Sequence, residues 1–322
     1  MPSHHELVGK TYGSMQDYYT RFPNHWAQVR EYIRAPAAEM LGVMILVLFG
    51  DGVVCQVSLA SNPKVTPAPA GDWLSVNTAW GIGAALGVWI SAGVSGGHIN
   101  PVVTVCAALF RGFPWKRVPV YIFSQVLGAY LAALIVYANY FHAIDIVEGK
   151  GIRTVPGTAG YFTPYPPPYM TAANCFFDEF ICSFLLVITV WIVTDPKNGP
   201  TSIGMLAIAV YFVVVGIGAS FGLQTGYMVN PARDLGPRLM TWTVGYGREV
   251  FNFRSQYWLW CTLLGPMAGG ITATFMYDCL IYQGTDSIIN KPCAAARQYL
   301  SAPSKKDDAA TLTSATSAMD AV

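Results

Sequence analysis

SGGHINPVVTV at residues 95–105 and GYMVNPARDLGPR at residues 226–238 are the most informative stretches of this chain. Each stretch contains an Asn-Pro pair, beginning at Asn100 or Asn230, that follows a long apolar run. An Asn can cap a helix whose first turn begins at the next Pro. Backbone that leaves helical geometry at membrane depth is tolerated only where it is buried in protein or lines a water-filled cavity. One such interruption in each half of the chain therefore predicts two short helices that face a cavity.

The composition predicts a polytopic membrane protein. The chain has 322 residues, of which 53% are hydrophobic and only 11% are charged. A soluble globular domain carries about 25% charged residues. The formal net charge of +1 gives no indication of nucleic acid as a partner. The seven Cys residues are scattered without a CxxC pair or metal-ligand spacing, so we expect no disulfide and no bound metal.

Six apolar runs are long enough to cross the roughly 30 Å hydrocarbon core of a bilayer as helices. We place them near residues 35–58, 74–95, 117–140, 173–194, 202–223 and 256–282. Two shorter apolar stretches, 101–110 and 231–241, follow the Asn-Pro pairs and are too short to cross alone. The predicted fold is an all-α membrane protein with six transmembrane helices plus two re-entrant half-helices.

The two halves of the chain show the same order of features. The first half has a span containing Glu39, a second span and then Asn100, and the second half has a span containing Glu179, a second span and then Asn230. Three spans per half give the halves opposite orientations, which is an inverted repeat. The half-helices then enter from opposite faces of the membrane and meet at the midplane.

The predicted organisation is an N-terminal tail (1–34), a channel-like membrane domain (35–285) and a C-terminal tail (286–322). The C-terminal tail is rich in Ala, Ser and Thr and lacks apolar periodicity, so we expect it to be disordered. Basic residues near span ends are modestly enriched on the side of both termini, which predicts cytoplasmic termini. The plasma membrane is the default location, and gating by the tails or by the loop 141–172 stays open.

These motifs resemble those of the major intrinsic proteins, the aquaporins and glycerol facilitators. The resemblance covers about residues 35–285 and rests on SGGHINP, on Asn-Pro-Ala-Arg-Asp, and on Glu39 and Glu179 at matching places. It implies a passive channel rather than an enzyme, with no cofactor, embedded in the lipid bilayer as a homotetramer with one pore per subunit. Asp234 in the second motif resembles the glycerol-conducting branch, the aquaglyceroporins.

Asn100 and Asn230 are the predicted pore-centre residues. Their side-chain amides offer donors to a passing oxygen, and the N-termini of both half-helices direct positive dipole ends at the same point. A cation or hydrated proton meets a barrier there, whereas a neutral hydroxyl passes. The half-helices begin with Pro101-Val102 and with Pro231-Ala232, followed by Arg233 and Asp234. Val102 stands where the family usually has Ala, and we assume that it faces packing rather than the lumen.

The resemblance also implies a selectivity constriction, assigned by spacing to Trp80, Gly218, Tyr227 and Arg233. Gly218 lacks a side chain and is expected to open room, while Trp80 and Tyr227 form an apolar corner. Arg233 donates to hydroxyls through its rigid fork of N–H groups. A small polyol has this two-sided character, so glycerol is the expected permeant together with water. Tyr227 departs from the more common Phe, and its hydroxyl either narrows the ring or adds a hydrogen bond.

Other positions are assigned to the pore wall and its support. The resemblance implies wall carbonyls at Gly97, His98 and Ile99 and at Gly226, Met228 and Val229. Glu39 and Glu179 are buried carboxylates that need partners, and we expect each to brace a re-entrant loop by accepting backbone N–H bonds. We interpret His98 as a packing residue rather than a pH gate. The role of Asp51 stays open.

Three alternatives to a glycerol channel were weighed against the same residues. The first is a water-selective channel with little glycerol flux. The second is a proton-coupled polyol transporter, which would need titratable residues positioned to change partner during transport, and a hinge. The third is an intramembrane enzyme, for which the spans offer no His cluster, paired Asp motif or Ser/His arrangement. The sequence also leaves open the preference among glycerol, urea, peroxide and larger polyols.

Overall fold

The computed structural model describes residues 14–198 and 202–301. Its α-helices are α2 (Met15–Arg21), α3 (His25–Ala60), α4 (Trp73–Ser95), α5 (Pro101–Phe110), α6 (Val118–Glu148), α7 (Ala172–Thr194), α8 (Ile203–Thr225), α9 (Pro231–Thr241), α10 (Glu249–Trp260), α11 (Leu264–Leu280) and α12 (Ala294–Ser301). Shorter turns are η1 (Trp115–Arg117), η2 (Thr158–Tyr161) and η3 (Trp242–Tyr246). Within the described residues, six helical segments are long and apolar enough to cross a membrane, which confirms the predicted all-α membrane fold.

The predicted spans differ from the observed helices mainly at their ends. Helix α3 begins at His25, well before residue 35, because Asn24 caps it by accepting a hydrogen bond from the Ala27 amide at 2.8 Å. Helix α6 continues to Glu148, so it includes the first part of the loop expected at 141–172. The sixth span is divided into α10 and α11 at residues 261–263, and α10 itself contains a break in the helical backbone at residues 253–256, where Arg254 and its two successors have positive φ angles.

Helices α4 and α8 end in the same way, and this turns the chain back into the bundle. Gly96 follows α4 with φ of 96°, and Gly226 follows α8 with φ of 79°. Glycine adopts this left-handed conformation without steric cost, so it terminates a helix readily. Each turn leads into an irregular re-entrant segment and then into a half-helix, α5 or α9, whose first residue is Pro101 or Pro231.

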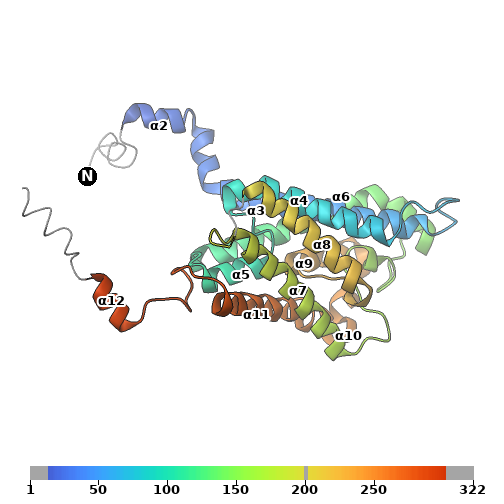
Figure 1. Cartoon of the computed structure of the whole chain (residues 1–322). Helices are drawn as coiled ribbons and strands as arrows, with labels where there is room; N and C mark the ends of the chain where they lie inside the picture. Colours follow the sequence, from blue (N-terminus) through green and yellow to red (C-terminus); the bar gives the residue numbers. More distant parts are fainter. Residues whose placement is uncertain (1–13, 199–201, 302–322) are drawn as a thin grey trace, which may run out of the picture.

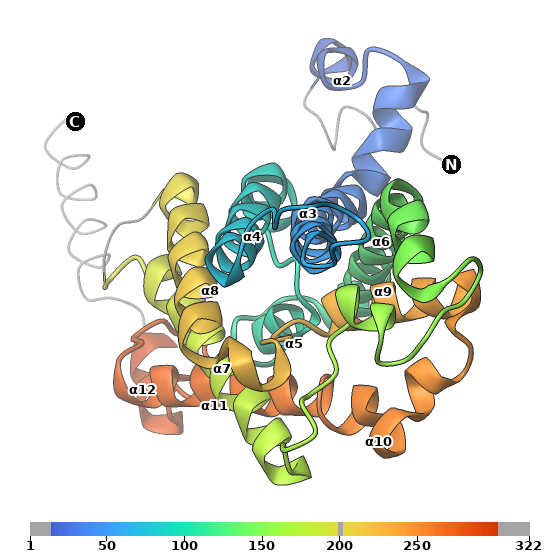
Figure 2. The same cartoon turned by 90° about the vertical axis from the view of Figure 1, so that its right-hand side faces the viewer.

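The packing follows the inverted repeat. Helix α3 packs against α4 and α6, and its counterpart α7 packs against α8 and α11. Each half-helix packs against the last span of the other half, α5 on α11 and α9 on α6. Figure 1 shows the long helices side by side, and Figure 2, a view along the bundle, shows α5 and α9 enclosed by them.

Two glycines allow equivalent close contacts in the two halves. A Cβ atom on Gly128 would lie 2.1 Å from the Met40 carbonyl oxygen, and one on Gly269 would lie 2.1 Å from the Phe180 carbonyl oxygen. These contacts bring α6 against α3 and α11 against α7 at the turns next to the two buried glutamates. The braces described below are therefore anchored where the backbones approach most closely.

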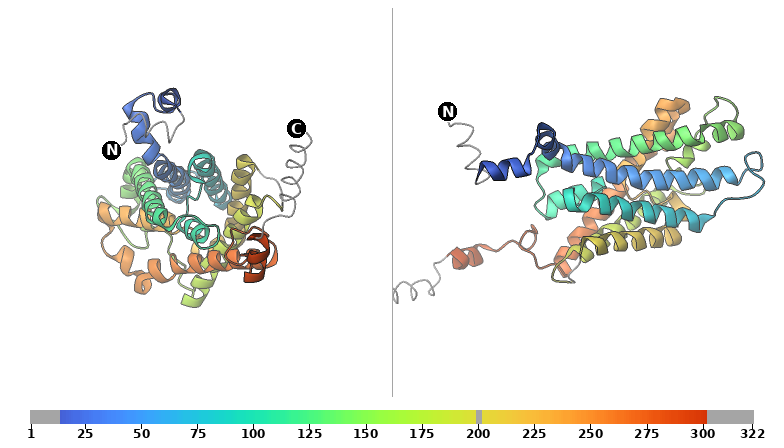
Figure 3. Two further views of the ribbon diagram at one scale, coloured as in Figure 1. Left: turned by 90° about the vertical axis from the view of Figure 1, so that its left-hand side faces the viewer. Right: turned by 90° about the horizontal axis from the view of Figure 1, so that it is seen from above.

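Both terminal segments leave the bundle at one end, which we call the terminal face, and the α3–α4 connection lies at the opposite end, the loop face (Figures 1 and 3). The expectation of disorder from residue 286 is wrong for residues 286–301. Ser287 is fully buried, and α12 follows at Ala294–Ser301. Local hydrogen bonds and burial compensate for the weak apolar pattern there. Residues 1–13 and 302–322 of the two predicted tails lie outside the described residues.

Candidate functional site

A cavity of about 330 Å³ lies between the two halves of the repeat. Helices α3, α4, α7 and α8 supply apolar lining residues, which include Leu46, Ala84, Val88, Leu186, Leu206 and Val210. The re-entrant segments 96–100 and 227–230 also line the cavity and bring Asn100 and Asn230 to it. A molecule in this cavity therefore meets both hydrocarbon and amide groups.

The two buried glutamates hold the re-entrant segments. Glu39 accepts hydrogen bonds from the amides of His98 at 3.0 Å and Ile99 at 2.7 Å. Glu179 accepts the equivalent bonds from Met228 at 2.9 Å and Val229 at 3.0 Å. Neither glutamate is exposed to solvent. Each carboxylate thus satisfies two successive backbone donors that have left helical geometry.

These bonds also fix an unfavourable backbone. Ile99 has φ of 41° and Val229 has φ of 45°. Positive φ costs roughly 1–3 kcal/mol at a non-glycine residue, and it is most unusual for β-branched side chains. The conformation directs the carbonyl oxygens of these two residues toward the midplane, where both are used as acceptors.

Asn100 and Asn230 connect the two halves at the midplane. Asn100 Nδ2 donates to the Val229 carbonyl oxygen at 2.9 Å, and Asn230 Nδ2 donates to the Ile99 carbonyl oxygen at 2.8 Å. Their Oδ1 atoms cap α5 and α9 by accepting from Val102 and Ala232 amides. An amide carries two N–H donors, so each asparagine retains one donor beyond its bond across the midplane. Both side chains line the cavity.

Trp80, Tyr227 and Arg233, three of the residues expected at the constriction, line the cavity toward the loop face. The guanidinium carbon of Arg233 lies 4.0 Å from the centre of the Trp80 ring, and Nη1 donates to the Phe162 carbonyl oxygen at 3.2 Å. A cation over an indole face is attracted by the ring quadrupole. Arg233 is 7% exposed, so this end of the cavity combines one buried guanidinium with two aromatic side chains.

Gly218 has a different role from the one expected. A Cβ atom there would lie 2.3 Å from Asn77 Oδ1 and 2.8 Å from Tyr227 Cζ. The space beside Gly218 is therefore filled by Tyr227 and Asn77 rather than open to a solute, and Gly218 is not part of the cavity wall. The Tyr227 hydroxyl donates to Asn77 Oδ1 at 2.7 Å. This hydrogen bond holds the Tyr227 ring in place.

The remaining half-helix residues serve packing. Val102 is fully buried, and its Cγ1 occupies the space that a side chain at Gly270 would need. Val102 is not among the residues that line the cavity. Asp234 accepts two bonds from Arg238, at 3.1 and 2.7 Å, and one from Thr262 at 2.6 Å. Its carboxylate therefore ties α9 to the start of α11.

His98 packs within a small aromatic group while its ring borders the cavity. The ring centre lies 4.8 Å from that of Phe113 and 5.3 Å from that of Tyr121. Its Nδ1 atom is 3.2 Å from Thr104 Oγ1. Within the described residues, no three His, Cys, Asp or Glu side chains are grouped so that they could hold a metal ion.

The sequence reasoning missed several residues at or beside the cavity. Asn77 is one helical turn before Trp80, and a polar residue inside an apolar span was the available signal. Gln125 is likewise a polar residue inside an apolar span, α6, and it donates to Glu39 at 2.8 Å. Arg111 lines the end of the cavity nearer the terminal face, and its charge next to a half-helix marked it in the sequence. Asp51 is fully buried, and its carboxylate oxygens have no hydrogen-bond partner among the described residues.

Comparisons with known proteins agree with this geometry. The family model described as Major intrinsic protein matches residues 26–277. Aquaporin-6 of Laccaria bicolor is 50% identical over 276 residues, which are 85% of this chain and 88% of that protein. The Aquaglycerol porin AQY3 of Saccharomyces cerevisiae is 43% identical over 272 residues, which are 84% of this chain but 41% of that longer protein.

A solved structure shows a similar fold. The aquaglyceroporin from Plasmodium falciparum superposes with a TM-score of 0.70 and 28% sequence identity. The match covers 78% of this chain and 97% of that chain.

Proposed function

The chain belongs to the major intrinsic protein family, and on that basis we propose that its cavity is a passive pore for glycerol and other small neutral solutes, together with water. At the level of the family it is an integral membrane channel and not an enzyme. The finer proposal, glycerol as a principal solute, depends on the residues of this chain.

The mixed lining of the cavity, with apolar side chains and amide groups, is the observation that carries the proposal. Glycerol presents carbon on one side and hydroxyls on the other. Apolar side chains of four helices offer contacts to the carbon side, while the re-entrant segments and the asparagine amides offer hydrogen bonds to the hydroxyls. Trp80, Tyr227 and Arg233 repeat this combination at the loop-face end. A solute then exchanges hydrogen bonds with water for hydrogen bonds with the wall as it passes.

We also propose that the pore excludes ions and protons. The N-termini of α5 and α9 both lie at the midplane next to Asn100 and Asn230. Helix N-termini carry about half a positive charge each, and Arg233 adds a full charge toward the loop face. Cations are repelled at both places, and a water molecule held by the asparagine N–H groups is oriented as an acceptor only.

A water-selective channel is the second candidate, and one observation favours it. The guanidinium carbon of Arg233 lies 4.0 Å from the centre of the Trp80 ring. These two side chains therefore occupy much of the space at the end of the pore lined by Trp80, Tyr227 and Arg233. Glycerol passage then requires the two side chains to separate slightly, whereas water does not. The two candidates therefore differ in one measurable ratio, glycerol flux over water flux.

Stopped-flow light scattering on proteoliposomes tests the proposal. The same vesicles are exposed to a glycerol gradient and to an impermeant osmolyte, with empty vesicles as the control. Fast shrinkage followed by fast re-swelling in glycerol supports the glycerol channel. Fast water shrinkage without re-swelling replaces it by the water channel. The lipid-facing change Leu223→Ala is a matched control, since Leu223 is 76% exposed and lies on a wall helix.

For the cellular arrangement, we propose a homotetramer in the plasma membrane with the terminal face in the cytoplasm. The distribution of Lys and Arg supports this orientation. Cys293 lies on the terminal segment and is exposed. A membrane-impermeant maleimide added to intact cells should leave Cys293 unlabelled until the membrane is permeabilised, and labelling before permeabilisation would reverse the orientation.

A further inference from the structure

A second buried arginine lies at the end of the cavity opposite Arg233. Arg111 directly follows α5 and lines the cavity together with Phe113, Trp191 and Thr194. Its side chain is only 12% exposed. This end is near the C-terminal end of α11 and therefore near the terminal face (Figure 1).

The Arg111 guanidinium is held in a fixed plane. Nη1 and Nη2 donate to the two oxygens of Asp278 at 2.6 and 2.5 Å, which is a bidentate pair. The guanidinium carbon lies 4.7 Å from the centre of the Trp191 ring and 3.9 Å from that of Tyr282. A flexible side chain is thereby ordered before any solute arrives, which lowers the entropic cost of binding.

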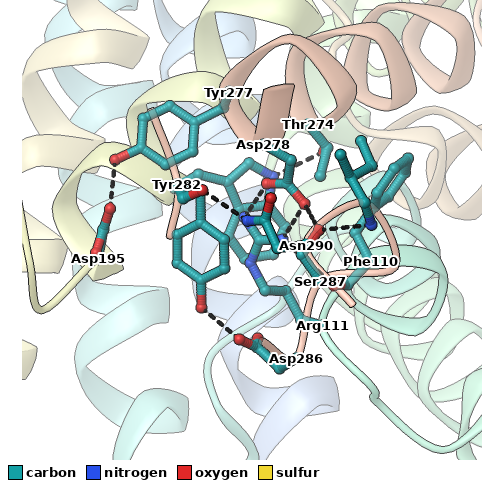
Figure 4. Close-up of polar contacts among 12 residues, drawn as sticks. Phe110, Arg111, Asp195, Thr274, Tyr277, Asp278, Tyr282, Asp286, Ser287 and Asn290 are labelled. Atoms are coloured by element: carbon teal, nitrogen blue, oxygen red, sulfur yellow. Dashed lines mark hydrogen bonds and ion pairs between the residues drawn. The ribbon is translucent and has the colours of Figure 1, made fainter. Parts of the chain in front are cut away.

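The segment after α11 completes this arrangement (Figure 4). Ser287 donates to Asp278 at 2.5 Å, so the carboxylate that holds Arg111 also holds the segment. Asn290 donates to the Tyr282 carbonyl oxygen at 2.6 Å. The Tyr282 hydroxyl donates to Asp286 at 2.8 Å. Burial and the hydrogen bond to Asp286 raise the pKa of Tyr282 to about 12, so the phenol remains a neutral donor at physiological pH.

We propose that Arg111 forms a second solute-binding station, selective for small neutral polyols, at the terminal-face mouth of the pore. This inference rests on the proposed glycerol function. A guanidinium has five N–H donors, and its bonds with described residues occupy Nη1 and Nη2 but not Nε. The remaining donors serve solute hydroxyls, and Phe113 supplies an apolar contact. Asp278 balances the charge of Arg111, so the station favours a neutral solute over an anion.

Each end of the pore then has an arginine guanidinium that lies over a tryptophan ring. Arg233 lies over Trp80 at 4.0 Å, and Arg111 lies over Trp191 at 4.7 Å. They differ in what holds the arginine. The residues that hold Arg111 include Tyr282 and, through Asp278, Ser287, so these are positioning residues for the station.

The test is the dependence of glycerol flux on glycerol concentration in proteoliposomes, with water flux measured on the same vesicles. Arg111→Met should raise the half-saturating glycerol concentration about tenfold, as expected for loss of a hydrogen bond to a charged group. Water flux, measured on the same vesicles, should change by a smaller factor than the half-saturating glycerol concentration. Arg117→Met is the matched control, because Arg117 is exposed on the same connection.

Two further variants separate binding from folding. Tyr282→Leu should shift the half-saturating concentration in the same direction, and combining it with Arg111→Met should add little. If Arg111→Met does not fold, Arg111→Lys retains the charge beside Asp278 but loses the fork, and it should show the same weakening. Glycerol saturation like that of Arg117→Met in the folded Arg111 variant would overturn the station. Water flux without glycerol flux in the unchanged protein would overturn the proposed function, and the station with it.

Discussion

Replacing Gly218 by Ala tests whether this glycine sets the position of Tyr227. The new Cβ would lie 2.3 Å from Asn77 Oδ1, 2.7 Å from Asn77 Cγ and 2.8 Å from Tyr227 Cζ. Ordinary contact between such atoms begins near 3.4 Å. Asn77 and the Tyr227 ring must therefore move by about 1 Å, and the bond of 2.7 Å between them is disturbed.

The energy of this displacement decides the expected size of the effect. Overpacking costs typically 1–3 kcal/mol, and the disturbed hydrogen bond adds about 1 kcal/mol. Space on one side of the Tyr227 ring is the cavity, so the ring moves into the loop-face end of the pore. A barrier raised by about 1.4 kcal/mol slows a solute about tenfold. We expect glycerol flux to fall at least that much, while water, which needs less width, falls less.

Gly216→Ala is the matched control for this experiment. It lies on the same helix, and a Cβ there meets no atom within 4 Å. Both variants are reconstituted at equal protein density, and glycerol and water fluxes are measured by light scattering. The reasoning is refuted if Gly218→Ala folds and keeps the glycerol-to-water ratio of Gly216→Ala.

Three further predictions concern other parts of the pore. Glu179→Gln leaves at least one buried N–H of the re-entrant segment without its acceptor, at a cost of about 1–3 kcal/mol, so thermal unfolding in detergent should shift downward; an unchanged midpoint contradicts the brace. Val102→Ala removes buried packing against Gly270 and should lower stability by about 1 kcal/mol with both fluxes unchanged, since Val102 lies outside the cavity wall; altered flux would place it at the lumen. Arg233→Ala removes the buried charge at the loop-face end of the pore and should raise the leak of protons or cations. The leak is followed with a pH-sensitive dye inside vesicles under an imposed potential. If the variant leaks no more than the unchanged protein, ions are excluded at the midplane alone.

The fold was predictable because its determinants are local in the sequence. The apolar runs predict the spans, and each Asn-Pro pair predicts the residue at which a half-helix begins. The break inside α10 was not predictable, because Arg254, Ser255 and Gln256 adopt positive φ angles that none of these residue types prefers. The ordered segment at 286–301 was missed for a related reason. Ser287 is buried and donates a hydrogen bond to Asp278 of α11, and the composition of the segment does not reveal such a contact.

The sequence predicted which residues belong to the candidate site better than it predicted how their side chains contact one another. Spacing from the asparagines selected Trp80, Tyr227 and Arg233, which the structure brings together at one end of the cavity. Spacing could not reveal that Asn77 fills the room beside Gly218, because that contact joins α4 to α8. Arg111 was read only as a topology signal. A hydrogen bond to Asp278, which lies far along the chain, holds Arg111 at the cavity wall, and the sequence does not reveal this contact.

The bonds that cross the midplane have a consequence for how the protein is made. Asn100 donates to Val229 and Asn230 donates to Ile99, so each half supplies the acceptor that the other needs. When the ribosome has delivered only the first three spans, the Asn100 amide has no such acceptor, and its strained neighbour has nothing across the midplane to hold it. The centre of the molecule is therefore finished last, after the second half has entered the bilayer. Because the exchange is reciprocal, a single half on its own could satisfy these groups only through a two-fold contact with a second copy inserted in the opposite orientation.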